Sequence, residues 1–329
     1  MTSVGIIASP AAGKDVRRLV ANAGSVGDVD KISMIRRAAV GAVEAGATRL
    51  VVLDDARHLV LRALVEGQRL GDGLDVEVLD LEPMGTGRDS ERAAAALAKA
   101  EVGAVLVFGG DGTNRDVAKG WPDAAVVPIA VGTNNVFPQH IEATLGGVAA
   151  GLVAGGVVAV DEAATRAKVI HVHVPGHEPD QALVDLVLVD GGFVGSRAVW
   201  HVDDVREALF VIAEPGSVGL SSIGAALAPV DRLDEGGVAV WLDPEAPLGV
   251  RVPVAPGTFA DVGVVDHRTV TSADEIRFDG PGVLAFDGER DHVLGSSDHA
   301  VAAIRRDGPW VISPQAAIAI ATRNNFFTT

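Results

Sequence analysis

Short β-branched runs alternate with longer helical patterns over residues 1–130, and this alternation limits the possible folds more than any other feature of the sequence. The pattern is typical of a parallel sheet connected by crossover helices. The runs expected as strands are apolar enough to be buried on both faces, and they are Val4–Ala8, Leu50–Leu53, Val76–Leu79, Ala104–Phe108 and Val126–Ala130. Helices are expected between them at Lys31–Ala45, Arg57–Leu70 and Ser90–Ala100. The first part of the chain is therefore predicted to be an open α/β sheet.

After about residue 155 the pattern changes to short strands separated by Gly, Pro and Asp, which favours antiparallel β layers. The expected strands lie within residues 157–163, 167–174, 182–190, 236–243, 262–266, 275–280 and 282–289. Helical patterns interrupt them at Asp203–Ala213 and Ser221–Leu227, and a short helix is expected at Pro314–Thr322. The predicted fold class is α/β, with an open parallel sheet followed by an antiparallel β-sandwich.

The segment Ala143–Val160 carries no charge and spaces three glycines four residues apart, as helices that pack within bilayers do. Five glycines interrupt the segment, and its apolar residues are mostly Ala and Val, which argues against a transmembrane span. We expect a helix of a globular domain at Thr144–Ala154, followed by a strand at Val157–Val160.

Composition and charge exclude several classes of protein. The chain has 329 residues, of which 48% are hydrophobic, so it has enough apolar surface for a large core and is not intrinsically disordered. Its formal net charge of −17 disfavours nucleic acids and anionic membrane surfaces as partners. There is no cysteine, which excludes disulfides, thiolate nucleophiles and zinc–thiolate sites. Because no export leader precedes the first charged residues, we expect a cytoplasmic protein.

The strongest local motif is Gly-Gly-Asp-Gly-Thr-Asn at Gly109–Asn114, directly after a strand and before an expected helix. Glycines there let backbone N–H groups approach a polyphosphate, Thr113 offers a hydroxyl, and the helix presents its positive end. Asp111 would lie beside phosphate charge, which makes it a candidate for Mg²⁺ binding or general-base catalysis. The alternative is an ordinary glycine turn in which Asp111 caps the helix.

A second polar loop, Gly-Thr-Asn-Asn at Gly132–Asn135, follows the next strand along the chain. The carboxyl ends of neighbouring parallel strands lie at one edge of a sheet, where open α/β sheets bind ligands. We therefore expect this loop to meet the motif at Gly109–Asn114.

The turn at Ser9–Asp15 after the first strand is similar to a Walker A motif but does not satisfy it. Ala8 stands where the first glycine is needed, and Asp15 replaces the Ser or Thr that binds Mg²⁺. The first βα turn also has no Gly-x-Gly-x-x-Gly fingerprint. These departures argue against a P-loop NTPase and against a dehydrogenase. Lys14 either supplies positive charge to the site or is solvated at a helix start.

Two other kinds of site are disfavoured. His171 and His173 lie on one face of an expected strand, with His177 nearby, but no third metal ligand follows from the sequence. We therefore interpret these histidines as solvent-facing or packed strand residues. A serine hydrolase would need a nucleophile elbow of the Gly-x-Ser-x-Gly type, and neither Gly195-Ser196 nor Gly216-Ser217 provides one.

Taken in order, these motifs resemble those of the superfamily that joins ATP-NAD kinases with diacylglycerol and sphingosine kinases. The motif at Gly109–Thr113 is similar to its Gly-Gly-Asp-Gly-Thr signature, and Gly132–Asn135 to its Gly-Thr-x-Asn loop. The turn at Ser9–Asp15 resembles its Asn-Pro-x-Ser-Gly turn, with Ser9 and Ala12 as departures. Asp287-Gly288-Glu289 is similar to the Asp-Gly-Glu/Gln of its carboxy-terminal β domain. Residues 10–20, 193–200 and 213–224 look most like the ATP-NAD kinase-like branch that includes acetoin catabolism protein X.

The resemblance implies roles for individual residues. Asp111 matches the acid proposed in NAD kinases to deprotonate the acceptor hydroxyl, and Glu289 matches the acid that lipid kinases use for that step. Ala182–Asp185 resembles the Ala-Leu-Asn-Glu segment that binds the dinucleotide, with Val in place of Asn, and residues 214–222 only partly match a second acceptor segment. The implied acceptor-binding residues are Asp185, Ser217, Ser221 and Asp287. The implied nucleotide-binding residues are Ser9, Pro10, Gly13, Lys14, Gly109, Gly110, Gly112, Thr113, Asn114, Gly132, Thr133, Asn134 and Asn135.

The resemblance also implies an organisation and an activity. Residues 1–140 would form a nucleotide-binding domain on which residues 305–329 pack back, and residues 141–304 would form a β-rich acceptor-binding domain. The implied reaction is transfer of a phosphoryl group from ATP, with Mg²⁺, to an alcohol hydroxyl, and NAD is the default acceptor. A small metabolite alcohol is one alternative acceptor, and an inactive nucleotide-binding regulator is an alternative function. Family habit implies a homo-oligomer, and no metal ligand is assigned.

Overall fold

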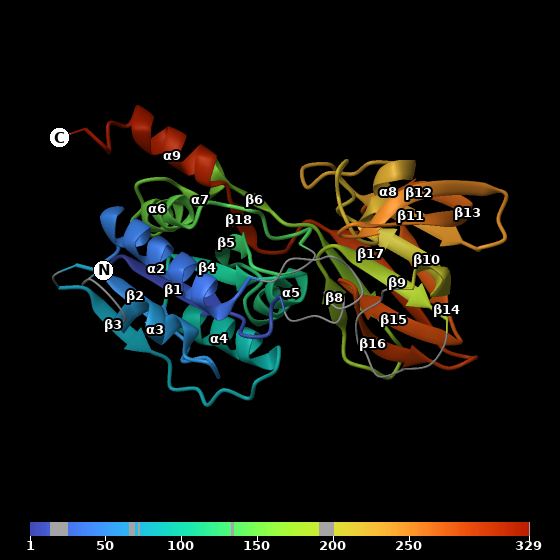
Figure 1. Cartoon of the computed structure of the whole chain (residues 1–329), viewed down its shortest axis with the longest axis horizontal. Coiled ribbons are helices and arrows are strands. Elements are labelled where there is room, and N and C mark those ends of the chain that lie inside the picture. The colour runs from blue at the N-terminus through green and yellow to red at the C-terminus, as the bar shows by residue number, and fades with distance from the viewer. Residues whose placement is uncertain (14–25, 66–69, 72, 133–134, 191–200, 329) are drawn as a thin grey trace.

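The structure, a computed structural model, describes residues 1–13, 26–65, 70–71, 73–132, 135–190 and 201–328. Figure 1 shows two bodies side by side, one of mixed helices and strands and one mostly of strands. The segment that ends in α9 returns from the second body to the first, so both termini lie on the same body.

The first body is built on a seven-stranded sheet with the order β3-β2-β1-β4-β5-β18-β6. Its strands are β1 (Ser3–Ala8), β2 (Arg49–Val52), β3 (Asp75–Val78), β4 (Ala104–Gly109), β5 (Ala125–Ala130), β18 (Trp310–Ile312) and β6 (Ala164–Arg166). All neighbouring pairs are parallel except β18 with β6. The strands expected before residue 130 are confirmed, with ends that differ by at most one residue. β1 lies between β2 and β4, where the strand order reverses, and open α/β sheets bind ligands beside such a point.

Helices cover both faces of this sheet because its strands are apolar on both sides. The helices of the first body are α2 (Asp28–Glu44), α3 (Leu59–Val65), α4 (Arg88–Lys99), α5 (Asp111–Gly120), α6 (Ala143–Ala154), α7 (Val160–Ala163) and α9 (Pro314–Arg323). Leu106 and Phe108 of β4 are buried in one core with α2 and α6, whereas Val105 and Val107 are buried in another with α4 and α5. Side chains of β4 thus alternate between the two faces of the sheet. α5 and its first turn lie on the face that Val105 and Val107 cover.

Glycines allow α2 and α6 to pack backbone to backbone. A Cβ on Gly147 would lie 1.9 Å from the carbonyl oxygen of Ala38, and one on Gly41 would lie 2.1 Å from that of Thr144. The four-residue glycine spacing in α6 thus belongs to a helix pair inside the protein. No helix within the described ranges has the length and apolar character needed to span a bilayer.

The second body consists of two antiparallel sheets, as predicted. One has the order β12-β13-β11-β10-β9-β15-β16 and the other β14-β17-β7-β8. Their strands are β7 (Val169–His173), β8 (Asp180–Ala182), β9 (Asp185–Val189), β10 (Val205–Phe210), β11 (Gly237–Leu242), β12 (Leu248–Ala255), β13 (Thr258–Val270), β14 (Glu275–Asp279), β15 (Gly282–Phe286), β16 (Glu289–Leu294) and β17 (His299–Arg305). Apolar side chains from both sheets form one core, and α8 (Ser221–Leu227) packs on the outer face of the larger sheet.

Two expected elements are wrong. The predicted helix Asp203–Ala213 is a short 3-10 turn (Val202–Asp204) followed by β10. β10 pairs with β9 on one side and β11 on the other, and this pairing overrides the helical preference of its Glu, Ala and Leu residues. The predicted strand Val157–Val160 is a turn that leads into α7. The N–H groups of Val157 and Val158 donate to the carbonyl oxygen of Leu152, so a sheet ladder cannot use them.

The chain crosses between the two bodies after β6 and again before β18. Residues 143–166 pack with the first sheet, because α6 lies on α2 and β6 pairs with β18. We therefore propose to divide the chain into an α/β half (residues 1–166 and 307–329) and a β-rich half (residues 167–306), which moves the boundary expected at residue 140.

The α2–α6 contact makes a stability prediction. Gly147→Ala forces a methyl group against the Ala38 carbonyl, and we expect it to lower the free energy of unfolding by about 1–3 kcal/mol in urea denaturation. Gly146→Ala in the same helix is the control. Its nearest neighbour is the end of the Ile129 side chain at 3.2 Å, and Ala favours a helix, so stability should stay equal or rise. Equal losses in both variants would contradict this account of the helix pair.

Candidate functional site

The turn between β4 and α5 is held by its own side chains. Asn114, which is 2% exposed, donates from Nδ2 to the carbonyl oxygen of Gly110 at 2.9 Å. A Cβ on Gly109 would lie 2.4 Å from the Thr113 side chain, so only glycine fits there. The Asn114 side chain therefore stabilises the turn. The backbone N–H groups of Gly110 and Gly112 are the part of the motif that suits an anion.

The loop after β5 closes in the same way and meets the first turn. The side-chain amide of Asn135 accepts from the N–H of Gly132 at 3.1 Å and donates to its carbonyl oxygen at 2.8 Å. A Cβ on Gly132 would lie 3.1 Å from the Cα of Gly110, so the two glycine turns are in direct contact. Thr133 and Asn134 lie outside the described residues.

Asp111 joins the two turns. Its Oδ1 accepts from the backbone N–H groups of Val136 at 3.0 Å and Phe137 at 2.8 Å. Arg232 of the β-rich half donates to the carbonyl oxygens of the same two residues, at 2.7 Å for Phe137, and its Nε donates to Glu214 at 2.9 Å. Residues 136–137 are thus bound on their N–H side by the α/β half and on their C=O side by the β-rich half.

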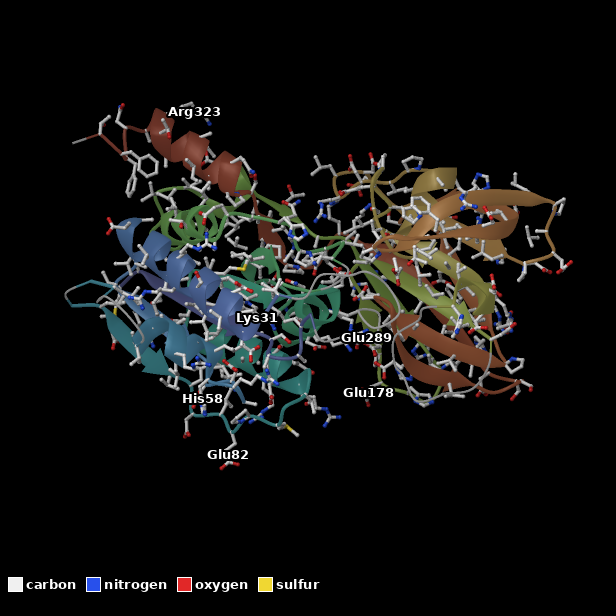
Figure 2. All side chains as sticks on the ribbon, in the orientation of Figure 1. Lys31, His58, Glu82, Glu178, Glu289 and Arg323 are labelled. Carbon is white, nitrogen blue, oxygen red and sulfur yellow. The ribbon has the colours of Figure 1, made fainter. Side chains whose placement is uncertain are left out.

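The turn after β1 is built around a buried lysine. Ser9 accepts from the N–H of Ala12 at 3.2 Å, and Gly13 has a φ of 77°, which favours glycine. Lys31, on α2, is 1% exposed and donates to the carbonyl oxygens of Ser9 at 3.2 Å and Ala12 at 2.6 Å. Figure 2 shows Lys31 at the end of α2 that faces the β-rich half. Lys14 lies outside the described residues, and Pro10 is half-buried in this turn.

Asp287 and Gly288 form the two-residue loop between β15 and β16. Their φ angles are 50° and 78°, as a type I′ hairpin turn requires. The buried Asp287 carboxylate accepts from the backbone N–H groups of Leu183 at 3.0 Å and Val184 at 2.8 Å, and the N–H of Gly288 donates to Asp185 at 3.2 Å. The two segments expected to contact the acceptor are therefore tied to each other.

Arg115 connects this hairpin to α5. It is 6% exposed, and its Nη1 donates to the carbonyl oxygen of Phe286 at 2.9 Å. Burial raises the pKa of the Asp287 carboxyl, whereas the Arg115 guanidinium and the backbone N–H groups at residues 183–185 act against that rise. Arg115 therefore supplies the positive charge that a buried carboxylate needs.

Glu289 approaches α5 from the β-rich half. A Cβ on Gly112 would lie 3.6 Å from its Oε1, so the carboxylate lies beside the first turn of α5, where the helix dipole favours negative charge. Figure 2 shows Glu289 at the boundary between the two halves. Asp111 and Glu289 thus reach the start of the same helix from different halves.

A cleft at the boundary between the halves brings several of the predicted residues together. It is lined by Asp111, Val136, Asp185, Val218, Gly219, Leu220, Ser221, Asp287 and Gly288. The predicted acceptor residues Asp185, Ser221 and Asp287 thus lie around one space with Asp111. Ser217 is not among the lining residues, and its N–H closes a turn by donating to Glu214 at 3.0 Å.

Sequence reasoning missed Lys31, Arg115 and Arg232. Lys31 falls at a buried position of an amphipathic helix, which is a weak signal because lysine is seldom buried without partners. Arg115 lies four residues after Asp111 on α5, but nothing local indicates that it reaches β15. No signal in the sequence connects Arg232 to residue 136.

His171, weighed as a metal ligand, pairs with Asp307 at 2.9 Å. The described part of the chain contains no group of three His, Asp or Glu side chains able to hold a metal ion.

Asp116, also on α5, makes stability depend on pH. Burial raises its pKa from 3.8 to about 6, with Glu289 and Glu91 adding to the rise and Arg115 and Lys119 opposing it. The folded protein therefore binds an extra proton between about pH 4 and pH 6, and the stability that this proton contributes is lost as the pH rises through about 6. Asp116→Asn removes that titration.

We expect the free energy of unfolding of the wild type, relative to Asp116→Asn, to fall as the pH rises from 4.5 to 7.5. Urea denaturation of both proteins at these two pH values measures the difference. A difference that is constant, or that grows with pH, would contradict the raised pKa of Asp116.

Known proteins resemble the chain over nearly its whole length. It is 34% identical over 306 residues to acetoin catabolism protein X of Cupriavidus necator, a match that covers 90% of this chain and 85% of that protein. The family model of the acetoin catabolism protein X C-terminal domain matches residues 168–307. A crystal structure of yeast NADH kinase complexed with NADH aligns with a TM-score of 0.55 and 13% identity, covering 100% of this chain and 89% of that chain. The chain therefore belongs to the acetoin catabolism protein X family, and its fold is of the NAD kinase type.

Proposed function

We propose that the protein is a phosphotransferase that moves the terminal phosphoryl group of a nucleoside triphosphate, with ATP as the expected donor, to an alcohol hydroxyl. The observation that carries this proposal is the meeting of the turns at Gly110 and Gly132 beside Asp111, which lines the cleft between the halves. Phosphoryl transfer needs alignment, charge neutralisation and one proton acceptor, with little covalent chemistry from the protein.

The donor phosphates would bind at the carboxyl edge of β1, β4 and β5. Backbone N–H groups of Gly110 and Gly112 at the start of α5 offer hydrogen bonds and the positive end of the helix dipole. Lys31 contributes a fixed positive charge behind the β1 turn. Mg²⁺ is usually bound through one or two carboxylates together with substrate phosphates, and Glu289 beside the first turn of α5 fits that requirement.

The proton of the acceptor hydroxyl would pass to a carboxylate while its oxygen attacks the terminal phosphorus. The bond from that phosphorus to the bridging oxygen breaks, and the nucleoside diphosphate leaves with the electron pair. Asp111 is better placed than Glu289 to take the proton, because it lines the cleft in which we expect the acceptor to bind. Glu289 would then contribute a negative charge beside the first turn of α5.

Two observations support different acceptors. The fold shared with a kinase whose structure contains NADH supports NAD or NADH. Membership of a family named for acetoin catabolism supports a small metabolite alcohol. A regulator that binds nucleotide without turnover is the alternative function, and acceptor-dependent release of ADP separates it from an enzyme.

Substitution of the two carboxylates tests the mechanism. We expect Asp111→Asn to lower kcat by about 10²–10⁴-fold, because general-base catalysis contributes that much, while binding of MgATP persists. Glu289→Gln should lower kcat less. Coupled ADP release with a panel of NAD, NADH, polyols and hydroxyketones measures turnover, and calorimetric titration measures nucleotide binding.

Circular dichroism and thermal unfolding of both variants provide the control for folding. A larger loss of kcat in Glu289→Gln than in Asp111→Asn would assign the base to Glu289. Nucleotide binding by the wild type without acceptor-dependent release of ADP would favour the regulator.

A further inference from the structure

One peptide group lies directly between Arg232 and Asp111. It is the peptide that joins Val136 to Phe137. The Phe137 N–H donates to Asp111 Oδ1 at 2.8 Å, and the Val136 carbonyl oxygen accepts from Arg232 Nη2. The guanidinium and the carboxylate thus lie at the two ends of one amide dipole, each at the end that its charge favours. Hydrogen bonds in such a chain polarise one another, so the positive charge strengthens the bond to Asp111.

The neighbouring backbone groups repeat this arrangement. The N–H of Val136 also donates to Asp111 Oδ1, at 3.0 Å, and the carbonyl oxygen of Phe137 accepts from Arg232 Nη1 at 2.7 Å. Two successive N–H groups that point the same way make a concave site for an anion. Two successive carbonyl oxygens match the planar fork of a guanidinium, which a lysine does not have. Arg232 therefore fixes the direction of the two N–H groups, and these fix the Asp111 carboxylate.

The position of Arg232 is itself fixed by charged contacts. Its Nε donates to Glu214 at 2.9 Å. The loop 231–236 that carries it is bound by two cations from the strands that cross between the halves. Lys168, which is 4% exposed, donates to the carbonyl oxygens at both ends of this loop, at 2.8 and 2.9 Å. Arg306 donates to three carbonyl oxygens within it. Movement of the loop would leave these charges without partners, which is costly.

Arg166 offers a matched comparison. Its side chain is 22% exposed, against 24% for Arg232, and it also bonds to one carboxylate, of Asp123 at 2.7 Å, and to one backbone carbonyl, of Asp307 at 3.2 Å. Asp123 and Asp307 precede β5 and β18, at the amino ends of these strands, whereas Asp111 follows the carboxyl end of β4. Loss of Arg166 therefore removes similar contacts at the opposite edge of the sheet.

We propose that Arg232 is a positioning residue of the transfer reaction, which orients the Asp111 carboxylate toward the acceptor hydroxyl through the peptide between residues 136 and 137. This inference rests on the proposed phosphoryl transfer. Arg232 and Glu214 belong to the β-rich half, so the base is oriented only when the two halves are joined. Glu214 also begins the segment 214–221, whose last four residues line the cleft. Arg232 thus connects the base with the acceptor side of the site.

NMR spectroscopy reads this peptide group directly. Val-Phe occurs at 107–108 and at 136–137, so valine labelled with carbonyl ¹³C and phenylalanine labelled with ¹⁵N give two coupled amide signals, which Phe137→Leu assigns. We expect Arg232→Ala to move the proton and nitrogen signals of Phe137 upfield, because the hydrogen bonds on both sides of its amide weaken. The signal of Phe108, in β4, should move much less. Arg166→Ala should leave both signals in place.

Kinetics separate positioning from folding. With MgATP and whichever acceptor among NAD, NADH, glycerol and hydroxyacetone the wild type uses fastest, we expect Arg232→Ala to lower kcat by about 10–100-fold, as loss of a hydrogen bond to a charged group does. The KM for MgATP should stay within about threefold, because the N–H groups of Gly110 and Gly112 are unchanged. Millimolar guanidinium should restore part of kcat, and methylammonium should restore less. Arg166→Ala should keep its kcat and show no response to guanidinium.

Arg232→Lys is the second variant, in case the alanine variant does not fold. It keeps the charge without the fork, so its kcat and its Phe137 signal should lie between those of the wild type and Arg232→Ala. A Phe137 signal that does not move, or a loss of kcat no larger than in Arg166→Ala, overturns the role of Arg232 and leaves the kinase proposal standing. Absence of acceptor-dependent ADP release by the wild type overturns the kinase proposal, while the Phe137 signal still decides whether Arg232 orients Asp111.

Discussion

The structure depends on how one stretch of backbone, Val136–Phe137, is held between the two halves of the molecule. Its N–H groups donate to Asp111 at the start of α5, and its carbonyl oxygens accept from Arg232 of the β-rich half. A hydrogen bond to a charged group contributes about 1.5–3 kcal/mol, and each charge here is bound to more than one backbone group. These contacts set the position of the loop after β5 relative to α5, and they set the position of α5 relative to the second half.

The same carboxylate that joins the turns also lines the cleft, so structure and proposed chemistry meet at Asp111. One turn further along α5, Arg115 holds the Asp287–Gly288 hairpin, and Glu289, which follows the hairpin, lies beside the first helical turn. Two acids thus lie at one helix start. Glu289 reaches it from the β-rich half, and Asp111 is fixed by residues 136–137, which Arg232 binds from the β-rich half. A site assembled in this way requires both halves, and movement between them would change the cleft before it changed either core.

The sequence was sufficient for the parts of the fold that depend on local pattern. Strands such as Ala104–Gly109 are continuous apolar runs, and the glycine turns follow them directly, so their meeting at one edge could be predicted. β10 could not be predicted, because pairing on both sides decides its conformation against its helical composition. Arg115, Arg232 and Lys31 also escaped prediction, since each acts on residues at least 19 positions away that only the folded chain brings near. The resemblance names Ser221, but the lack of a hydrogen-bond partner for its hydroxyl among the described residues follows from packing and could not be predicted.

A crystal structure of the protein with Mg²⁺ and a non-hydrolysable nucleoside triphosphate would test the central claim most directly. We expect the triphosphate to lie along the turns at Gly110 and Gly132, with its terminal phosphate near Asp111 and its oxygens within hydrogen-bond distance of the first N–H groups of α5. A nucleotide bound away from these two turns, with no phosphate near Asp111, would contradict the proposed phosphate site.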